Sequence, residues 1–147
     1  MERNWDLIRE ILRILAEKDQ IYYGKPLYDI DFIEELKNKK YHKNVIKYHL
    51  KIMIDEGFID GDNISSLDLI TVRDFKDGLY KKLCSEEPNT EHYCIKEMTY
   101  QGQDLWEAIK EKSVWEKITQ YATKNKIPLT LDTIKMIIPM LLKTMFS

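Results

Sequence analysis

Hydrophobic residues near the amino terminus recur at the spacing of an amphipathic helix, with polar residues on the opposite face. The apolar positions are Trp5, Ile8, Ile11, Leu12 and Leu15. Asn4 precedes them and belongs to the residue types that accept hydrogen bonds from the first backbone amides of a helix. The pattern therefore predicts a first helix over residues 5–18.

The following apolar groups predict two further helices with a polar turn between them. Gly24 and Pro26 mark residues 21–28 as a connection, in which Tyr22 and Tyr23 favour a short strand. Residues 30–36 predict a second helix, and residues 38–42 predict the turn. The buried face of a third helix is predicted to hold Val45, Ile46, His49, Leu50, Ile52 and Met53. Gly57 is placed to end this helix, because glycine readily adopts the left-handed conformation found there.

Beyond Gly57 the pattern changes to that of extended chain. Phe58 and Ile59 begin a first extended piece, residues 67–73 are rich in residues that favour strands, and residues 92–98 alternate as a partner strand would. Turn-forming residues gather between residues 74 and 91. We therefore predict a long β-hairpin.

The carboxyl-terminal part predicts three more helices. Thr99 is expected to cap a fourth helix, with apolar positions at Leu105, Trp106 and Ile109. Ser113 is expected to cap a fifth, and Pro128 separates it from a last helix over residues 130–146.

The order of three helices followed by a hairpin is that of a winged helix-turn-helix domain. We expect a mainly α fold of the α+β class. In it, residues 1–112 form the winged helix-turn-helix domain, with an extended wing at about residues 62–98. Residues 113–147 are expected to form a helical extension that serves dimerisation.

Charge along the chain singles out the third helix. The chain has 23 Lys and Arg residues against 25 Asp and Glu residues, so its net charge of −2 does not by itself attract nucleic acid. Residues 37–51, however, hold six lysines and no acidic residue, whereas residues 1–36 and 52–68 carry net charges of −4 and −5. Lys43, Lys47 and Lys51 are four residues apart and are predicted to share one exposed helix face.

A basic third helix in this fold predicts double-stranded DNA as the partner, because that helix commonly enters the major groove. The residues expected to contact DNA are Lys40, His42, Lys43, Asn44, Lys47 and Lys51 of the helix and Arg73, Lys81 and Lys82 of the wing. Asn44 is suited to read adenine, whereas the helix lacks an arginine for guanine. The alternative is an interaction module that uses the same scaffold to bind a host protein, for example a defence protein.

Four blocks of the chain resemble one known family: RNWDLIR at residues 3–9, YHL at 48–50 with EGFI at 56–59, MTYQGQDLW at 98–106 and SVW at 113–115. The chain is similar there to the bacterial and phage family called domain of unknown function twenty-five thirteen. It departs from that family's pattern over residues 62–96 and at Gln103. The resemblance implies a winged-helix-like fold, frequent residence in prophages and no established activity. We therefore expect a phage or prophage transcriptional regulator.

No residues have the spacing of a catalytic or metal site. Cys84, His92 and Cys94 are potential zinc ligands, but zinc takes four and the chain has no CxxC pair. His49 is predicted to be a core histidine, and Glu34 and Glu35 a solvated helix face. We expect no enzyme activity, no metal and no cofactor.

The last helix is apolar around most of its circumference, more than one small domain usually covers. We predict a homodimer through Ile134, Ile137, Ile138, Leu141, Leu142 and Met145; the alternative is a core helix of a monomer. Residues 134–142 contain Lys135 and Pro139 and are too short to span a membrane. Two cysteines and a charged amino terminus without a signal sequence predict a cytoplasmic protein.

Overall fold

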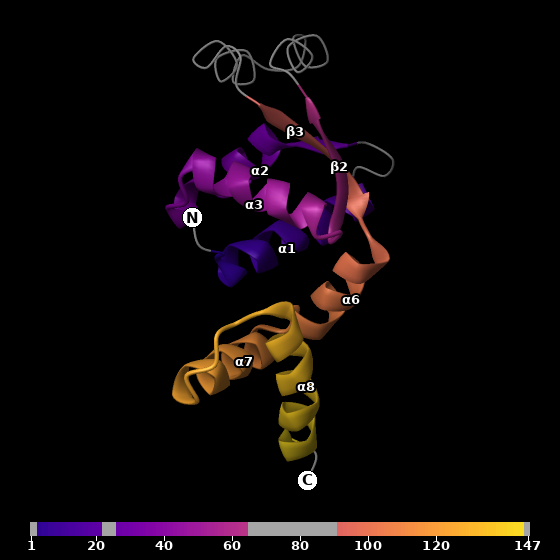
Figure 1. Ribbon diagram of the computed structural model, residues 1–147. Helices are drawn as coiled ribbons and strands as arrows, with labels where there is room; N and C mark the ends of the chain where they lie inside the picture. Colours follow the sequence, from indigo (N-terminus) through magenta and orange to yellow (C-terminus); the bar gives the residue numbers. More distant parts are fainter. Residues whose placement is uncertain (1–2, 22–25, 65–90, 146–147) are drawn as a thin grey trace. The chain divides into compact units, whose positions relative to one another are not determined.

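The computed structural model describes residues 3–21, 26–64 and 91–145 (Figure 1). These residues form two compact units that divide after Gln103. The sequence instead predicts a boundary after residue 112, in the loop that follows the fourth helix. The division falls earlier because Gly102 packs against the backbone of Phe58, which holds the start of that helix in the first unit.

The first unit combines three helices with a small antiparallel sheet. Its elements are α1 (Trp5–Ile21), β1 (Leu27–Tyr28), α2 (Asp29–Glu35), the 3-10 turn η1 (Lys37–Lys39), α3 (Lys43–Asp55), β2 (Ile59–Ile64), β3 (His92–Met98) and the start of α6 (Tyr100–Ile109). The strand order is β1-β3-β2. The expected mainly α fold of the α+β class is confirmed at this level.

β1 was missed in the sequence, since residues 21–28 read as a connection. It has two residues, and it exists because Leu27 and Tyr28 pair with Ile95 and Cys94 of β3. Such a strand depends on a partner about 67 residues away and leaves no alternating pattern of its own. The strand expected at Tyr22 and Tyr23 lies outside the described residues.

Local signals placed the start of α1 and the end of α3 correctly, whereas α1 runs to Ile21, three residues beyond its predicted end. Oδ1 of Asn4 accepts a hydrogen bond from the backbone amide of Leu7 at 3.1 Å, as an N-cap does. At the end of α3, Gly57 has φ +82°. The amide of Phe58 donates to the carbonyl of Met53 and that of Gly57 to Ile54, which is the Schellman arrangement. The helix therefore stops abruptly and the chain turns directly into β2.

The core of the first unit lies where the three helices contact β3 (Figure 1). Its fully buried side chains include Ile11, Leu12, Phe32, Ile46, Leu50, Phe58 and Ile95. They come from four elements and the turn after α3, so each element is held by apolar contacts that non-neighbouring segments supply.

β2 and β3 form the base of the predicted hairpin. The pairing runs from Ile59 opposite Met98 to Ile64 opposite His92, with an irregularity between Asp60 and Gly61. A Cβ atom at Gly61 would lie 2.6 Å from the carbonyl oxygen of Cys94, so this bulge requires glycine. The predicted strand over residues 67–73 and nearly all of the predicted tip, residues 74–90, lie outside the described residues.

The second unit contains the rest of α6, α7 (Lys112–Lys124) and α8 (Leu131–Met145). Ser113 is not the cap of α7: that position belongs to Glu111, whose φ and ψ of −71° and 120° are extended. Ser113 lies inside the first helical turn, where its backbone is already helical. At the start of α8, the hydroxyls of Thr130 and Thr133 each accept from the other residue's backbone amide. None of the described helices has the length and apolar character needed to cross a membrane.

Candidate nucleic-acid interface

The start of α3 projects a group of basic and polar side chains. Lys39, Lys40, His42 and Asn44 are exposed, and Lys43 is half-buried. Lys40 has a left-handed φ of 64°, which turns the chain from η1 toward α3. Nδ1 of His42 then accepts from the amide of Asn44 at 3.1 Å, so His42 is the N-cap of α3. The turn and the cap fix the direction in which this group faces.

Farther along α3, the exposed sector is narrow. It contains Asn44, Lys51 and Asp55, with Tyr48 half-buried beside them. An α-helix advances about 100° per residue, so these four positions lie within about 60° of one another around the axis. The sector therefore faces one direction, but only Lys51 carries a positive charge in it.

Lys47 differs from the prediction. Its exposed fraction is 9%, and its Nζ lies 3.7 Å from Oδ2 of Asp29, which is fully buried. The prediction that Lys43, Lys47 and Lys51 share an exposed face is wrong for this residue. Each step of four residues moves about 40° around a helix, and Lys47 falls at the border where α3 faces α2.

Asp29 is the centre of a buried polar cluster formed with Lys47 and His92. Nδ1 of His92 lies 2.9 Å from Oδ2 of Asp29, and the backbone amide of Tyr93 donates to Oδ1 at 3.2 Å. The cluster joins α2, α3 and β3, so it fixes α3 against the base of the hairpin. Sequence reasoning missed it, because nothing local distinguishes Asp29 from the exposed acids of α2.

His92 therefore has a structural partner, whereas the sequence grouped it with Cys84 and Cys94 as potential metal ligands. Cys94 is half-buried and Cys84 lies outside the described residues. Across the described part of the chain, no three His, Cys, Asp or Glu side chains gather as metal ligands do.

His49 connects α3 to the start of α1. Its Nδ1 lies 2.8 Å from the carbonyl oxygen of Val45, and its Nε2 accepts from the backbone amide of Asn4 at 2.8 Å. Burial lowers the pKa of His49, with a smaller lowering from the nearby Arg3, against the hydrogen bond to Val45. The prediction of a hydrogen-bonded core histidine is confirmed.

The remaining predicted contacts divide into two groups. Arg73, Lys81 and Lys82 of the wing lie outside the described residues. In α8, Ile134 and Ile137 are fully buried in the unit that α7 and α8 form within one chain, so the prediction that they face a second copy is wrong. Ile138 and Leu141 are half-buried, and the side chains of Leu142 and Met145 are not among those that the structure describes. The homodimer itself stays a prediction.

Comparison with known proteins gives a family and one relative. A family model described as "Hypothetical protein (DUF2513)" matches residues 2–127. The chain is also similar to a protein of Haemophilus influenzae described as "Uncharacterized protein", with 26% identity over 147 residues that cover all of both chains. No solved structure matches.

Proposed function

The chain belongs to the DUF2513 family, and we propose that it is a non-enzymatic winged-helix protein that binds double-stranded DNA with the start of α3. The observation that carries this proposal is a set of three exposed lysines, Lys39 and Lys40 before α3 and Lys51 on it, which have no ion pairs among the described residues. In this proposal the protein is a phage or prophage transcriptional regulator.

The topology supports assigning α3 as the recognition helix. The order α1, β1, α2, α3, β2, β3 with the sheet order β1-β3-β2 supports the proposal of a winged-helix fold. In them the third helix enters the major groove with its amino-terminal residues toward the bases. Here that end carries Lys39, Lys40, Lys43 and Asn44.

Each exposed group has a role that follows from its chemistry. Lysine ammonium groups act as point charges for phosphate oxygens, so Lys39, Lys40 and Lys51 position the helix on the sugar-phosphate backbone of the DNA. The Asn44 side chain pairs with an adenine edge through its amide. Lys37 contributes less because Glu34 already holds its Nζ at 2.7 Å. Binding therefore depends on two lysines just before α3 and one in its third turn.

A salt series with a 20-base-pair duplex tests the proposal. About four phosphate contacts give a slope of log affinity against log salt near −3.5. Replacing Lys39, Lys40 and Lys51 together by alanine should reduce the magnitude of the slope by about 2.7, because each contact contributes about 0.9. The matched control replaces the exposed Lys117, Lys135 and Lys143 of α7 and α8, which changes net charge equally.

The proposal fails if the protein does not bind the duplex at low salt. It also fails if both triple variants reduce the slope of log affinity against log salt by the same amount. The second result would mean that DNA responds to net charge alone. Lys47→Met gives a further check. Because the Lys47 ammonium faces Asp29 and not solvent, its removal should leave the salt slope of DNA binding unchanged.

A protein-interaction module remains the second candidate function. The observation in its favour is Tyr100, the first residue of α6, whose exposed fraction of 90% is unusual for an aromatic side chain. Retention of a stoichiometric host protein without any DNA binding at low salt would favour this candidate over the first.

A further inference from the structure

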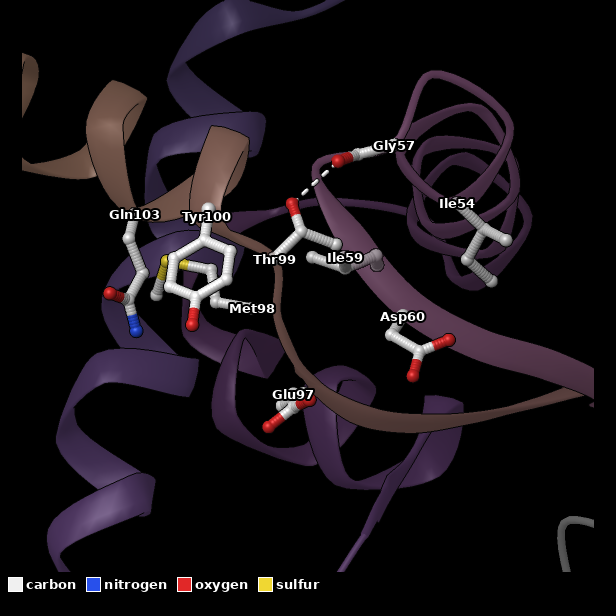
Figure 2. Close-up of a pocket in the computed structure, with 9 residues that line it drawn as sticks. All are labelled: Ile54, Gly57, Ile59, Asp60, Glu97, Met98, Thr99, Tyr100 and Gln103. Atoms are coloured by element: carbon white, nitrogen blue, oxygen red, sulfur yellow. Dashed lines mark hydrogen bonds between the residues drawn. The ribbon is translucent and has the colours of Figure 1, made fainter.

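A pocket of about 620 Å³ lies in the first unit, at the carboxyl-terminal end of α3 (Figure 2). It forms where α3 ends, β2 begins, β3 ends and α6 begins. Ile54, Ile59 and Met98 supply apolar surface, while Asp60, Glu97 and Tyr100 supply the chemistry that distinguishes it.

The walls of the pocket are fixed by backbone interactions. The hydroxyl of Thr99 donates to the carbonyl of Gly57 at 2.5 Å (Figure 2). The same hydroxyl accepts from the amide of Gly102 at 3.0 Å. The amide of Thr99 donates to the carbonyl of Phe58 at 3.1 Å. A Cβ atom at Gly102 would lie 1.9 Å from the carbonyl oxygen of Phe58, so only glycine permits this approach. The pocket is thus formed before any partner arrives, which lowers the entropy cost of binding.

The pocket is negatively charged. Asp60 and Glu97 are exposed and stand directly opposite each other on β2 and β3, an arrangement in which like charges repel. Among the described residues, neither carboxylate has a hydrogen bond or an ion pair, and the lining contains no lysine or arginine. Lys96 is next to Glu97 in sequence, but its Nζ pairs with Asp62 at 3.2 Å and interacts with Asp60 only through a weaker electrostatic attraction without an ion pair. A cation from outside the chain would relieve this repulsion.

Tyr100 offers a flat aromatic surface on the other side of the pocket. Figure 2 shows its ring near Met98 and Gln103, with Asp60 across the pocket. An aromatic face beside carboxylates suits a guanidinium group, which stacks on rings and pairs with carboxylates through its planar donors. A lysine ammonium lacks both the plane and the fork.

We propose that this pocket binds an arginine-bearing segment of a partner protein. The guanidinium group pairs with Asp60 and Glu97 and stacks on Tyr100, while an apolar neighbour of the arginine covers Ile54 and Met98. This site does not depend on DNA binding. Lys43 at the start of α3 lies eleven residues before Ile54, about 16 Å at the helical rise, whereas Lys51 lies only three residues before it. The start of α3 is therefore separate from the pocket.

The test compares two peptides on the full chain labelled with nitrogen-15. One is acetyl-Gly-Leu-Arg-Leu-Gly-amide, and the other carries citrulline, a neutral analogue of nearly the same shape, in place of arginine. We expect the arginine peptide to shift the amide signals of Gly57, Tyr100 and Gln103. We expect the citrulline peptide to bind at least about fivefold more weakly, since its side chain cannot pair with the carboxylates as a cation.

Variants assign the effect to the pocket. Asp60→Asn with Glu97→Gln should weaken the arginine peptide at least about fivefold, as should Tyr100→Ala. The control, Glu116→Gln with Asp132→Asn, makes the same charge change at exposed positions of α7 and α8 and should leave binding unchanged. The proposal is overturned if both peptides bind equally, if the shifted signals lie elsewhere, or if the control weakens binding as much as the pocket variant.

Discussion

The two ends of α3 carry opposite charges. Lys39, Lys40 and Lys43 surround its start, whereas Asp55 ends it and Asp60 follows shortly after in β2. Each set favours recognition of a charged partner, but the two partners would carry opposite charges. One helix therefore offers a surface for an anion at one end and for a cation at the other.

This arrangement opposes the dipole of the helix. Acidic residues stabilise the start of a helix and basic residues its end, each by about 0.3–1 kcal/mol. The first turn of α3 contains no acid and its last turn no base, whereas α2 begins with Asp29 and Asp31 as the dipole favours. The start of α3 therefore lacks the local stabilisation that the start of α2 has, which supports a role for the charges at the start of α3 in binding.

The largest expected effect concerns the lysine of the basic segment that is not exposed. Asp29→Asn should lower the free energy of unfolding by about 3 kcal/mol, because it leaves the buried ammonium of Lys47 without its counter-charge. Urea denaturation measures this change. A loss of this size would distinguish Lys47, which holds α3 in place through Asp29, from the lysines that face solvent.

Glu34→Gln is the matched control on the same helix. Glu34 is exposed and pairs with Lys37 on the surface, so its loss should cost less than about 1 kcal/mol. Equal costs for the two substitutions would contradict the structural role assigned to the buried cluster of Asp29, Lys47 and His92.

A second prediction concerns pH and the position of α3 against α1. The pKa of His49 is lowered below its ordinary value of 6.5, mainly by burial. As pH falls below 6.5, the unfolded chain takes up the proton first, so the free energy of unfolding should decrease. Protonation also removes the acceptor that Nε2 offers to the amide of Asn4.

Thermal unfolding between pH 5 and pH 7 measures this dependence. His49→Gln keeps one donor and one acceptor but does not titrate, so it should flatten the dependence in this range. An unchanged dependence in the variant would place its origin in another group.

The smallest expected effects test the dipole directly. Asn44→Asp places an acid in the first turn of α3 and should stabilise the fold by about 0.5 kcal/mol. The same change should weaken DNA binding, because it puts a negative charge beside the phosphates. Asp55→Asn, at the other end, should also stabilise by about 0.3–0.5 kcal/mol while leaving DNA binding intact.

Chemical denaturation and duplex binding, measured on both variants, decide the outcome. The comparison between the two ends breaks down if Asn44→Asp destabilises the fold, or if both variants change DNA affinity in the same direction and by the same factor.

Local sequence signals predicted the helices well. Asn4, Gly57 and Thr99 act on backbone groups within about four residues, so their effect is readable without knowing the fold. The exception is Ser113, where a suitable capping residue stands two positions inside α7 and Glu111 takes the cap. Capping chemistry of this kind narrows a helix end to a few residues.

The candidate sites could be predicted from the sequence less completely than the helices. Periodicity placed six lysines in the segment of α3 and its preceding turn, but it could not tell that Lys47 faces Asp29, a residue eighteen positions earlier. The pocket was missed for the same reason. Asp60 and Glu97 are distant in the chain and become neighbours only through the pairing of β2 with β3.

The sequence by itself determined where the described helices run, where α3 stops and which segment is basic, because helical spacing, capping and charge are properties of adjacent residues. Only the tertiary structure decided which lysines face solvent, that His92 serves a buried carboxylate, and that two acids meet beside Tyr100. The physical reason is that burial and charge pairing depend on segments that the fold brings together from distant parts of the chain.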